Sequence, residues 1–329
     1  MRAGASAILI FAGVFLFAIS GVAKAGPSLD QARFAYERGD YKAAVSLLQS
    51  AAEREPKNGA VYLLLAKTYY QMRDRDRAAA NAEKAVALDP GNSVYHEWLG
   101  RAYGEKASHA FWFSALSLAK KSRKEFETAV QLDPRNFSAM QALIEYDCSA
   151  PGIAGGGDDK AQREIAEIAA MDAAEGHYAR GNCRRQKKDF AAADAEFSEA
   201  LQSGPKSADL IYDIGDYAMK RSQPERLLEV ASIGEKVAPG DPRGGFYRAL
   251  AYILKSQKLG AAIETLNKYL NSAPVRDNYP SPSSAHYWLG RAFEAQNQTD
   301  SARREYQTAV NLDSDNRLAK EALKRVTPG

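Results

Sequence analysis

The sequence predicts an all-α fold, an α-solenoid of about eight helix–turn–helix repeats, and three observations carry this prediction. Similar helical stretches end at regularly placed prolines, which are Pro56, Pro90, Pro134, Pro205, Pro239 and Pro274. The gaps between these prolines are 34, 44, 71, 34 and 35 residues, and 34 is the period of a helix–turn–helix repeat. Small and apolar residues recur at helical spacing before each proline. Such an array buries its apolar faces between neighbouring repeats and leaves one long surface free.

The stretch 59–92 shows one repeat in full. Its apolar and small residues predict a first helix through Leu65, Ala66 and Tyr69 and a second through Ala78, Ala82 and Ala85. The small residues allow the two helix backbones to approach closely. Pro90 cannot continue a helix, so it ends the second helix and begins the next turn.

This pattern resembles the tetratricopeptide repeat (TPR), which reads W-x2-L-G-x2-Y, then A-x3-F-x2-A, then P. The stretches YHEWLGRAY at 95–103 and AHYWLGRAF at 285–293 are near-copies of its first half. The resemblance covers about 300 residues and implies a right-handed solenoid whose first helices line a concave groove. The repeats at 137–172 and 243–274 fit the pattern least well, and the fourth repeat is the expected soft point of the array.

The N-terminal residues predict a secretory signal. Arg2 precedes an apolar run over 7–19, and Ala23-Lys24-Ala25 follows as an A-x-A site, so we expect cleavage after Ala25. An uncleaved anchor is the alternative, but the run is shorter than the about 20 residues that span a bilayer. We therefore expect an exported protein, either periplasmic or extracellular.

The remaining chain divides into the TPR solenoid at 26–317 and a C-terminal segment at 318–329. Leu318, Ala322 and Val326 follow one another at four-residue steps, which predicts a helix that caps the last apolar face. Removal of the signal lowers the formal net charge from +3 to +1, because Arg2 and Lys24 are lost. A near-neutral chain of this kind has no general attraction to nucleic acid.

The two cysteines, Cys148 and Cys183, fall on the first helices of the fourth and fifth repeats. In an oxidising compartment they are able to form a disulfide that staples these repeats together. Two buried thiols are the alternative. The spacing is not C-x-x-C, which argues against a redox or zinc site.

The third repeat is about 10 residues longer than the others. The extra residues form a predicted hairpin at about 104–121, whose apolar part at 110–119 includes Phe111, Trp112, Phe113 and Leu116. A glycine-rich loop at 149–159 follows in the next repeat. We expect this loop to cover the hairpin, since large apolar patches are rare on soluble proteins. An exposed tip would instead mark a contact with a partner, a membrane or a second copy. Together with LGRAYGEKA, these segments resemble a bacterial subfamily of exported TPR proteins.

The sequence gives no indication of catalysis. None of the four histidines belongs to a metal-ligand motif, and no G-x-S-x-G is present, so we expect no catalytic residue, metal or cofactor. His96 and His286 recur at the same repeat position, which favours a structural role. A hydrolase, or a binder of sugars or lipids, would need a closed pocket between the array and the glycine-rich loop.

The resemblance places ligand contacts at defined positions of the first helices, and basic residues with tyrosines occupy these positions here. The expected groove residues are Arg33, Tyr36, Lys67, Tyr70, Arg101, Tyr178, Tyr212, Tyr287 and Arg291. Arginine offers paired donors to a carboxylate, and tyrosine gives rigid contact area. The lysine–asparagine clamp of chaperone-binding members is absent. A solvated helix face is the plain alternative.

We therefore predict a non-catalytic scaffold or adaptor of the cell envelope that binds a protein or peptide partner in its concave groove, and no nucleic acid. The alternative is a structural protein that self-assembles, or contacts a partner or membrane, through the hairpin 110–119.

Overall fold

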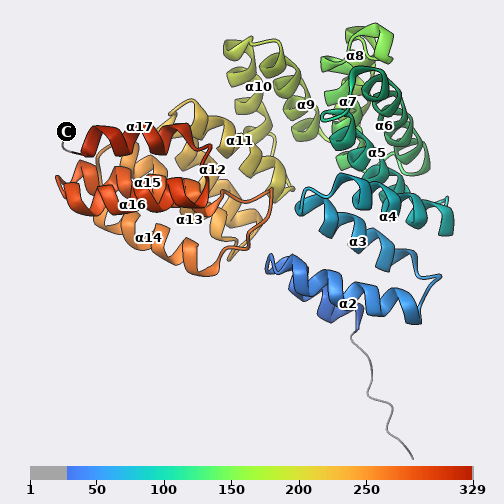
Figure 1. Cartoon of the computed structure of the whole chain (residues 1–329). Helices are drawn as coiled ribbons and strands as arrows, with labels where there is room; N and C mark the ends of the chain where they lie inside the picture. The colour runs from blue at the N-terminus through green and yellow to red at the C-terminus, as the bar shows by residue number, and fades with distance from the viewer. Residues whose placement is uncertain (1–27, 328–329) are drawn as a thin grey trace, which may run out of the picture.

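The computed structural model describes residues 28–327, and within this range every regular element is helical (Figure 1). The predicted signal lies outside the described residues. The helices are α1 (Leu29–Glu37), α2 (Tyr41–Arg54), α3 (Gly59–Gln71), α4 (Arg75–Leu88), α5 (Ser93–Ala107), α6 (Trp112–Leu132), α7 (Phe137–Ser149), the short 3-10 helix η1 (Gly152–Ala154), α8 (Asp158–Met171), α9 (Ala173–Gln186), α10 (Phe190–Gln202), α11 (Ala208–Lys220), α12 (Pro224–Val237), α13 (Pro242–Leu254), α14 (Leu259–Ser272), α15 (Pro282–Ala295), α16 (Thr299–Leu312) and α17 (Arg317–Val326).

The helices pair in sequence order, from α1–α2 to α15–α16, and α17 packs on the last pair. This arrangement confirms the predicted all-α solenoid of eight repeats. The two poorly fitting repeats are complete helix pairs, α7–α8 and α13–α14. In the described part of the chain, no helix is both long and apolar enough to cross a membrane.

Close helix packing explains why glycine recurs at one position of the first helices. A Cβ atom on Gly181 of α9 would lie 2.5 Å from the Phe197 ring of α10, and one on Gly290 of α15 would lie 2.4 Å from the Tyr306 ring of α16. Real Cβ contacts are never this short, so the aromatic ring of the second helix occupies the space that a side chain would need. The glycine and the aromatic residue therefore fix the distance between the two helices.

Turns inside the repeats share a local motif, a residue in the left-handed conformation followed by an aspartate that caps the second helix. In the second repeat Arg73 adopts a left-handed backbone (φ 60°), and Asp74 then caps α4 by accepting a hydrogen bond from the Arg77 backbone N–H. Lys188 and Asp189 repeat this arrangement before α10. Tight turns of this kind hold the two helices of a repeat antiparallel.

The apolar core is divided along the solenoid. One cluster fills the first three repeats and a larger one fills the fifth to eighth repeats. A small separate cluster joins the fourth repeat to α9 and is formed by Met140, Ile144, Ile165, Ile168, Ala179 and Cys183. This division lies at the fourth repeat, for which the sequence predicts a soft point.

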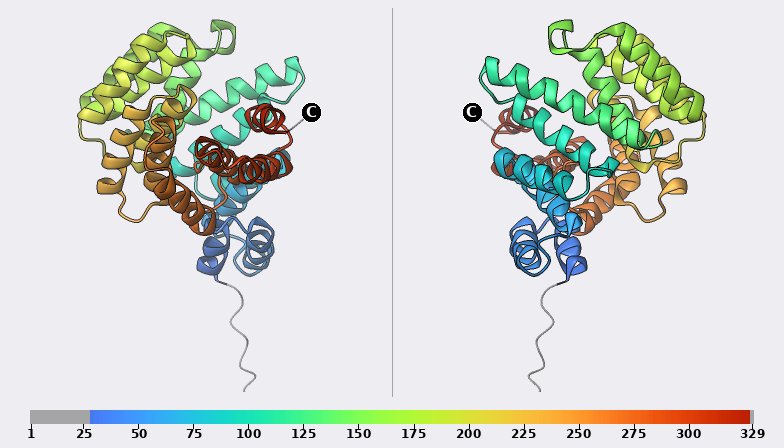
Figure 2. Two further views of the ribbon diagram at one scale, coloured as in Figure 1. Left: turned by 90° about the vertical axis from the view of Figure 1, so that its left-hand side faces the viewer. Right: turned by 90° about the vertical axis from the view of Figure 1, so that its right-hand side faces the viewer.

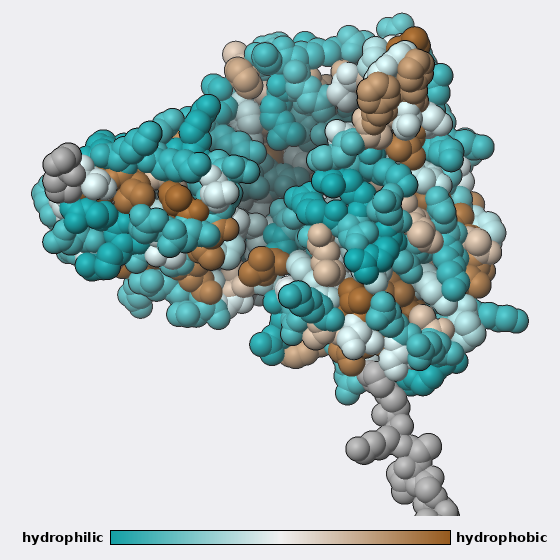
Figure 3. All heavy atoms as spheres, in the orientation of Figure 1, coloured by the Kyte–Doolittle hydropathy of each residue, from teal (hydrophilic) through white to brown (hydrophobic). Residues whose placement is uncertain are grey.

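The first helices form the inner layer of the superhelix. Neighbouring first helices touch one another, as α3 touches α5 and α5 touches α7, in addition to their own second helices. Figures 1 and 2 show that the superhelix curves until its C-terminal repeats face its N-terminal repeats. The face seen in Figure 3 is hollowed between these two ends. The candidate groove lies along this inner layer.

Candidate functional site

The N-terminal half of the inner layer carries an aromatic shelf with two cations on it. Trp98 of α5 and Tyr70 of α3 meet edge to face, with their ring centroids 5.7 Å apart. The Lys67 ammonium lies 4.7 Å from the centre of the Trp98 ring, and the Arg101 guanidinium lies 5.7 Å from it. We call Lys67, Tyr70, Trp98 and Arg101 the cation–aromatic shelf. All four side chains are partly exposed, so the shelf offers both charge and apolar area to a ligand.

Arg101 also has a structural role that its sequence position did not reveal. It donates to the carboxylate of Glu97 at 2.9 Å and to the Ser138 hydroxyl of α7 at 2.8 Å. Glu97 is only 5% exposed, so the pairing with Arg101 offsets the cost of burying its carboxylate. Arg101 therefore links two repeats as well as facing the groove.

Desolvation changes the chemistry of Lys67. Burial against the neighbouring helices lowers the pKa of its ammonium group, although the Glu97 carboxylate opposes this shift. A carboxylate ligand beside Lys67 would raise this pKa again. The lysine is thus a less solvated cation than those on the outer surface.

Arg33 and Tyr36 extend the shelf towards the N-terminus. Arg33 is exposed and lies 3.4 Å from Asp30 on the same helix, a pairing that leaves it available to a ligand. Tyr36 packs its ring 5.8 Å from that of Tyr41. The N-terminal predicted groove residues therefore share one surface with the cation–aromatic shelf.

The C-terminal predicted groove residues do not share that surface. Tyr212 is 1% exposed and Tyr287 is 8% exposed, so both belong to the core and their assignment to the groove is wrong. The Tyr212 ring turns between the helices and packs against Gly234 of α12. Arg291 donates to the Tyr287 hydroxyl at 3.1 Å and holds that ring in place.

Acidic groups replace basic ones in the middle of the inner layer. Tyr178 of α9 remains partly exposed and donates to Asp213 of α11 at 2.7 Å, and Tyr247 of α13 donates to Asp216 at 2.6 Å. Desolvation by the surrounding helices raises the pKa of both carboxyl groups. The inner layer is therefore basic near its N-terminus and acidic near its centre.

A loop that the sequence analysis did not single out closes the superhelix. Residues 273–281 join α14 to α15, and we call them the strap. On the C-terminal side, Arg243 of α13 donates to the Asn278 carbonyl at 3.0 Å and places its guanidinium 4.4 Å from the Tyr279 ring centre. The Tyr269 hydroxyl donates to the Pro280 carbonyl at 2.7 Å. These contacts fix the strap to the seventh repeat.

The other side of the strap contacts the first two repeats, as the orange loop beside α2 and α3 in Figure 1 shows. The Tyr41 hydroxyl of α2 donates to the Val275 carbonyl. The Gln71 side chain accepts from the Asp277 backbone N–H at 3.1 Å, and Arg73 lies 3.4 Å from the Asp277 carboxylate. The strap thus borders the groove beside Tyr36 and Tyr70.

His96 and His286 have structural contacts, as expected from their shared repeat position. His96 pairs with Glu125 at 2.6 Å, and His286 pairs with Glu305 at 2.7 Å. In each case the first helix of a repeat is joined to its second helix. Within residues 28–327, no group of three or more potential ligands forms a metal site.

The apolar hairpin is not covered, contrary to expectation. Phe111 is 74% exposed, Trp112 60% and Phe113 65%. The glycine-rich loop does lie beside α6, but it shares a pocket with Lys120 and Lys124, at least two helical turns from the tip. The loop is too far along the helix to shield the aromatic side chains. Leu116 is half-buried, so only the end of the hairpin is free.

A disulfide joins Cys148 of α7 to Cys183 of α9, with the Cα atoms 5.5 Å apart. It therefore connects the first helices of the fourth and fifth repeats, beside the smallest core cluster.

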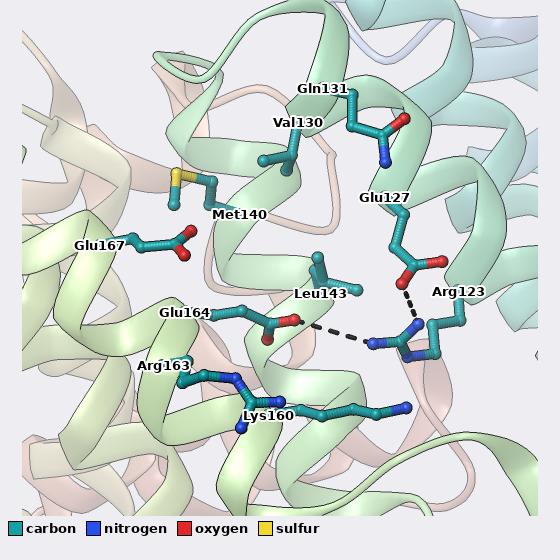
Figure 4. Close-up of a pocket in the computed structure, with 10 residues that line it drawn as sticks. All are labelled: Arg123, Glu127, Val130, Gln131, Met140, Leu143, Lys160, Arg163, Glu164 and Glu167. Atoms are coloured by element: carbon teal, nitrogen blue, oxygen red, sulfur yellow. Dashed lines mark hydrogen bonds and ion pairs between the residues drawn. The ribbon is translucent and has the colours of Figure 1, made fainter.

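An open cavity of about 310 Å³ lies between α6, α7 and α8 (Figure 4). Arg123 is its central charge, since it donates to both oxygens of Asp147 at 2.7 Å and also pairs with Glu127. Glu164 lies 3.8 Å from Arg123, and burial raises the pKa of its carboxyl group. The lining combines these charged groups with apolar side chains and contains no paired nucleophile and base. The ion pairs of Arg123 join α6 to α7 and so help to hold the fourth repeat in place.

Sequence reasoning missed two parts of this surface. Trp98 occupies the tryptophan position of the repeat pattern and was read only as a marker of the repeat. The length of the strap is the signal that indicates it in the sequence. Nine residues separate α14 from α15, whereas four separate α2 from α3. A long junction that contains several polar and aromatic residues is a candidate for a tertiary contact.

Comparisons with known proteins support the repeat assignment. Residues 35–102 and 254–317 match models of the tetratricopeptide repeat. A mouse protein, interferon-induced protein with tetratricopeptide repeats 2, is 28% identical over 109 residues, which are 32% of this chain and 23% of that protein. The chain thus matches less than a quarter of the length of this relative.

A solved structure shares the fold, and a second is similar to part of this chain. The crystal structure of the APC/C hetero-tetramer Cut9–Hcn1 aligns with a TM-score of 0.50 and 15% identity over 91% of this chain and 55% of that one. A thermophilic TPR protein of Thermus thermophilus aligns over 55% of this chain and 92% of its own, with 21% identity and a TM-score of 0.46. TPR proteins generally mediate protein–protein interactions and are typically non-catalytic scaffolds.

Proposed function

We propose that this protein is an interaction scaffold of the cell envelope that holds an extended partner segment in the N-terminal half of its concave groove. The cation–aromatic shelf is the single observation that carries the proposal. It combines partly exposed cations with two aromatic faces on adjacent first helices. Arg101 is also held by Glu97 and Ser138, whereas the contact of Lys67 with the Trp98 ring leaves the ammonium group available to a ligand.

The chemistry of the shelf indicates the kind of segment that it would hold. Arg33 and Lys67 would pair with acidic side chains or with a C-terminal carboxylate. Trp98 and Tyr70 would contact an apolar side chain next to that charge. The acidic groups near Tyr178 disfavour a segment that is acidic along its whole length. We therefore expect a short acidic and apolar segment that ends before the middle of the groove.

The proposed compartment rests on the N-terminal signal and on the disulfide. Residues 1–25 have the pattern of a secretory signal, and disulfides persist in oxidising compartments such as the periplasm. The Cys148–Cys183 bond suits such a compartment. Fractionation of cells that express the full chain, followed by N-terminal sequencing, tests this part of the proposal.

The groove is tested by reversing charges that the fold does not need. Arg33→Glu with Lys67→Glu changes the groove and leaves the Arg101–Glu97 ion pair in place. Arg101→Glu is unsuitable, because it would leave Glu97 unpaired beside a like charge, at a cost of about 3–5 kcal/mol. Lys42→Glu with Lys57→Glu makes the same change of charge at exposed positions on and after α2.

The assay is a crosslinked pull-down from the native envelope fraction with these three proteins side by side. We expect a protein captured by the wild type and by the Lys42/Lys57 variant and lost with the Arg33/Lys67 variant. Equal capture by all three proteins would refute the groove as the binding site.

A further inference from the structure

The end of the α5–α6 hairpin has a feature that the groove does not use. Three consecutive aromatic residues, Phe111, Trp112 and Phe113, stand exposed at the tip. The rings of Trp112 and Phe113 stack with their centroids 3.4 Å apart. Figure 2 shows the hairpin projecting beyond the neighbouring repeats, and Figure 3 shows apolar side chains gathered over its end at the upper right.

The fold does not need these rings. Leu118, further along α6, packs against the core of the first three repeats, so the helix is anchored without them. The tip lies at least two helical turns from the glycine-rich loop. An exposed cluster of large apolar side chains that stabilises nothing in its own chain indicates a contact with something else.

The charge on the hairpin segment itself has one sign, and Asp76 of α4, which lies beside it, is paired with Lys106. Residues 106–124 contain no acidic residue and five basic ones, Lys106, Lys120, Lys121, Arg123 and Lys124. Lys120, Lys121 and Lys124 are exposed, whereas Arg123 is held by Asp147. The nearest acidic residue of α5, Glu105, is paired with Arg73 and Arg75. The exposed lysines therefore follow the aromatic tip along α6, about 12 Å behind it.

The first turn of α6 adds unpaired donors at the same end. Its N-cap residue, Phe111, offers no side-chain acceptor to the first backbone N–H groups. Such groups bind anionic oxygens, phosphate among them.

We propose that this hairpin docks the protein on an anionic lipid surface. The three aromatic side chains enter the interface between headgroups and acyl chains, where tryptophan is favoured, and the lysines of α6 attract the headgroup phosphates. Aromatic anchors followed by a row of lysines are the pattern of an interfacial membrane contact. This inference is independent of the proposed groove, because no residue is shared between the two surfaces.

A second copy of the chain fits the tip less well. With 60–74% exposure, the three side chains offer roughly 300–550 Å² of apolar area, whereas a stable interface buries about 800 Å² on each partner. A surface of exposed lysines would also repel its copy across a two-fold axis. A lipid surface accepts an apolar tip of this size and attracts the lysines instead of repelling them.

Fluorescence of Trp112 tests the proposal. The chain has three tryptophans, and residues 1–27 contain none, so the predicted signal does not contribute to the readout. Trp98→Phe with Trp288→Phe leaves Trp112 as the only reporter in the full chain, and wild type is measured beside it. The probes are vesicles of brominated phosphatidylcholine, with or without phosphatidylglycerol.

We expect strong quenching of Trp112 when phosphatidylglycerol is present and weak quenching without it. Lys120→Glu with Lys121→Glu should weaken the binding at least about tenfold, and Lys57→Glu with Lys206→Glu, remote from the tip, should not. Phe111→Ser with Phe113→Ser, which keeps the reporter, should reduce the quenching.

Absence of quenching on anionic vesicles would overturn the proposal. So would equal quenching in the two charge-reversal variants. A concentration-dependent dimer in which Trp112 is protected from acrylamide before any vesicle is added would also overturn it, and would assign the tip to a second copy.

Discussion

Arg73 and Asp277 form an ion pair of 3.4 Å across 204 residues of sequence. The left-handed turn before α4 presents Arg73, and the strap between the seventh and eighth repeats presents Asp277. Tyr41 and the Val275 carbonyl form a second bond across the same junction. In a solenoid, where each repeat normally contacts only its neighbours, such contacts convert an open superhelix into a closed one.

Weakening of the strap should open the superhelix. Tyr41→Phe with Arg73→Ala removes the hydrogen bonds of the Tyr41 hydroxyl to Val275 and Gln71 and the ion pairs of Arg73 with Asp277 and Glu105. Each of these is worth about 1 kcal/mol or less. We expect a larger radius of gyration by small-angle X-ray scattering and faster amide exchange in α1–α3. Arg317→Ala removes an exposed pair within α17 and serves as the control. An unchanged radius of gyration in the Tyr41/Arg73 variant would show that the strap does not hold the ends together.

Reduction of the disulfide should destabilise the middle of the array. The Cys148–Cys183 bond closes a loop of 35 residues, for which the expected stabilisation is about 2–4 kcal/mol. In Cys148→Ala with Cys183→Ala, we expect the loss to be concentrated in α7–α9, where the core cluster is smallest. Hydrogen exchange resolved by repeat measures this. A uniform loss along the whole chain would contradict a local role.

Glu164 should make the stability fall as the pH rises. Burial raises the pKa of its carboxyl group above the ordinary value of about 4.3, so the folded state keeps a proton that the unfolded chain releases. The folded state therefore loses stability as the pH rises above that ordinary value. Glu164→Gln should flatten the dependence of Tm on pH between about pH 5 and 9. Glu225→Gln, at an exposed position, is the control, and an unchanged slope in Glu164→Gln would contradict the assignment.

The capping helix should respond to pH in the opposite direction. Arg325 of α17 donates two hydrogen bonds of 2.8 Å to Glu294 of α15, which lowers the pKa of that carboxyl group. This contribution is present above the ordinary carboxyl pKa and is lost as the pH falls through the lowered value. The pair is partly exposed, so we expect about 1 kcal/mol or less. Arg325→Ala should therefore lose less stability on acidification than the wild type in urea titrations, and an equal loss would contradict the pairing.

The regular part of the fold was predictable because it depends on local, repeated signals. The prolines after six of the second helices, the glycine opposite an aromatic residue and the spacing of small residues define most of the repeats, and the repeats at 137–172 and 243–274 follow them least well. The shared position of His96 and His286 also correctly indicated a structural role. These signals recur because every repeat packs two helices against each other and against the neighbouring repeats.

The departures from the repeat were harder to predict, since they depend on distant or single contacts. The position of Tyr212 suggested a groove contact, but its ring turns into the core. The exposed tip was expected to be covered, because the length of the glycine-rich loop does not reveal where along α6 it lies. The strap joins residues that are more than 200 positions apart, which no local pattern encodes.

The most direct measurement is site-specific photocrosslinking from the groove in living cells. A photoreactive phenylalanine at Tyr70 lies on the cation–aromatic shelf, and the same residue at Phe190, which is exposed at the start of α10, is the control. We predict a discrete protein adduct from position 70 that is lost when Arg33→Glu and Lys67→Glu are added, and none of that mass from position 190. The same adduct from both positions, or none from position 70, would contradict a partner in the groove.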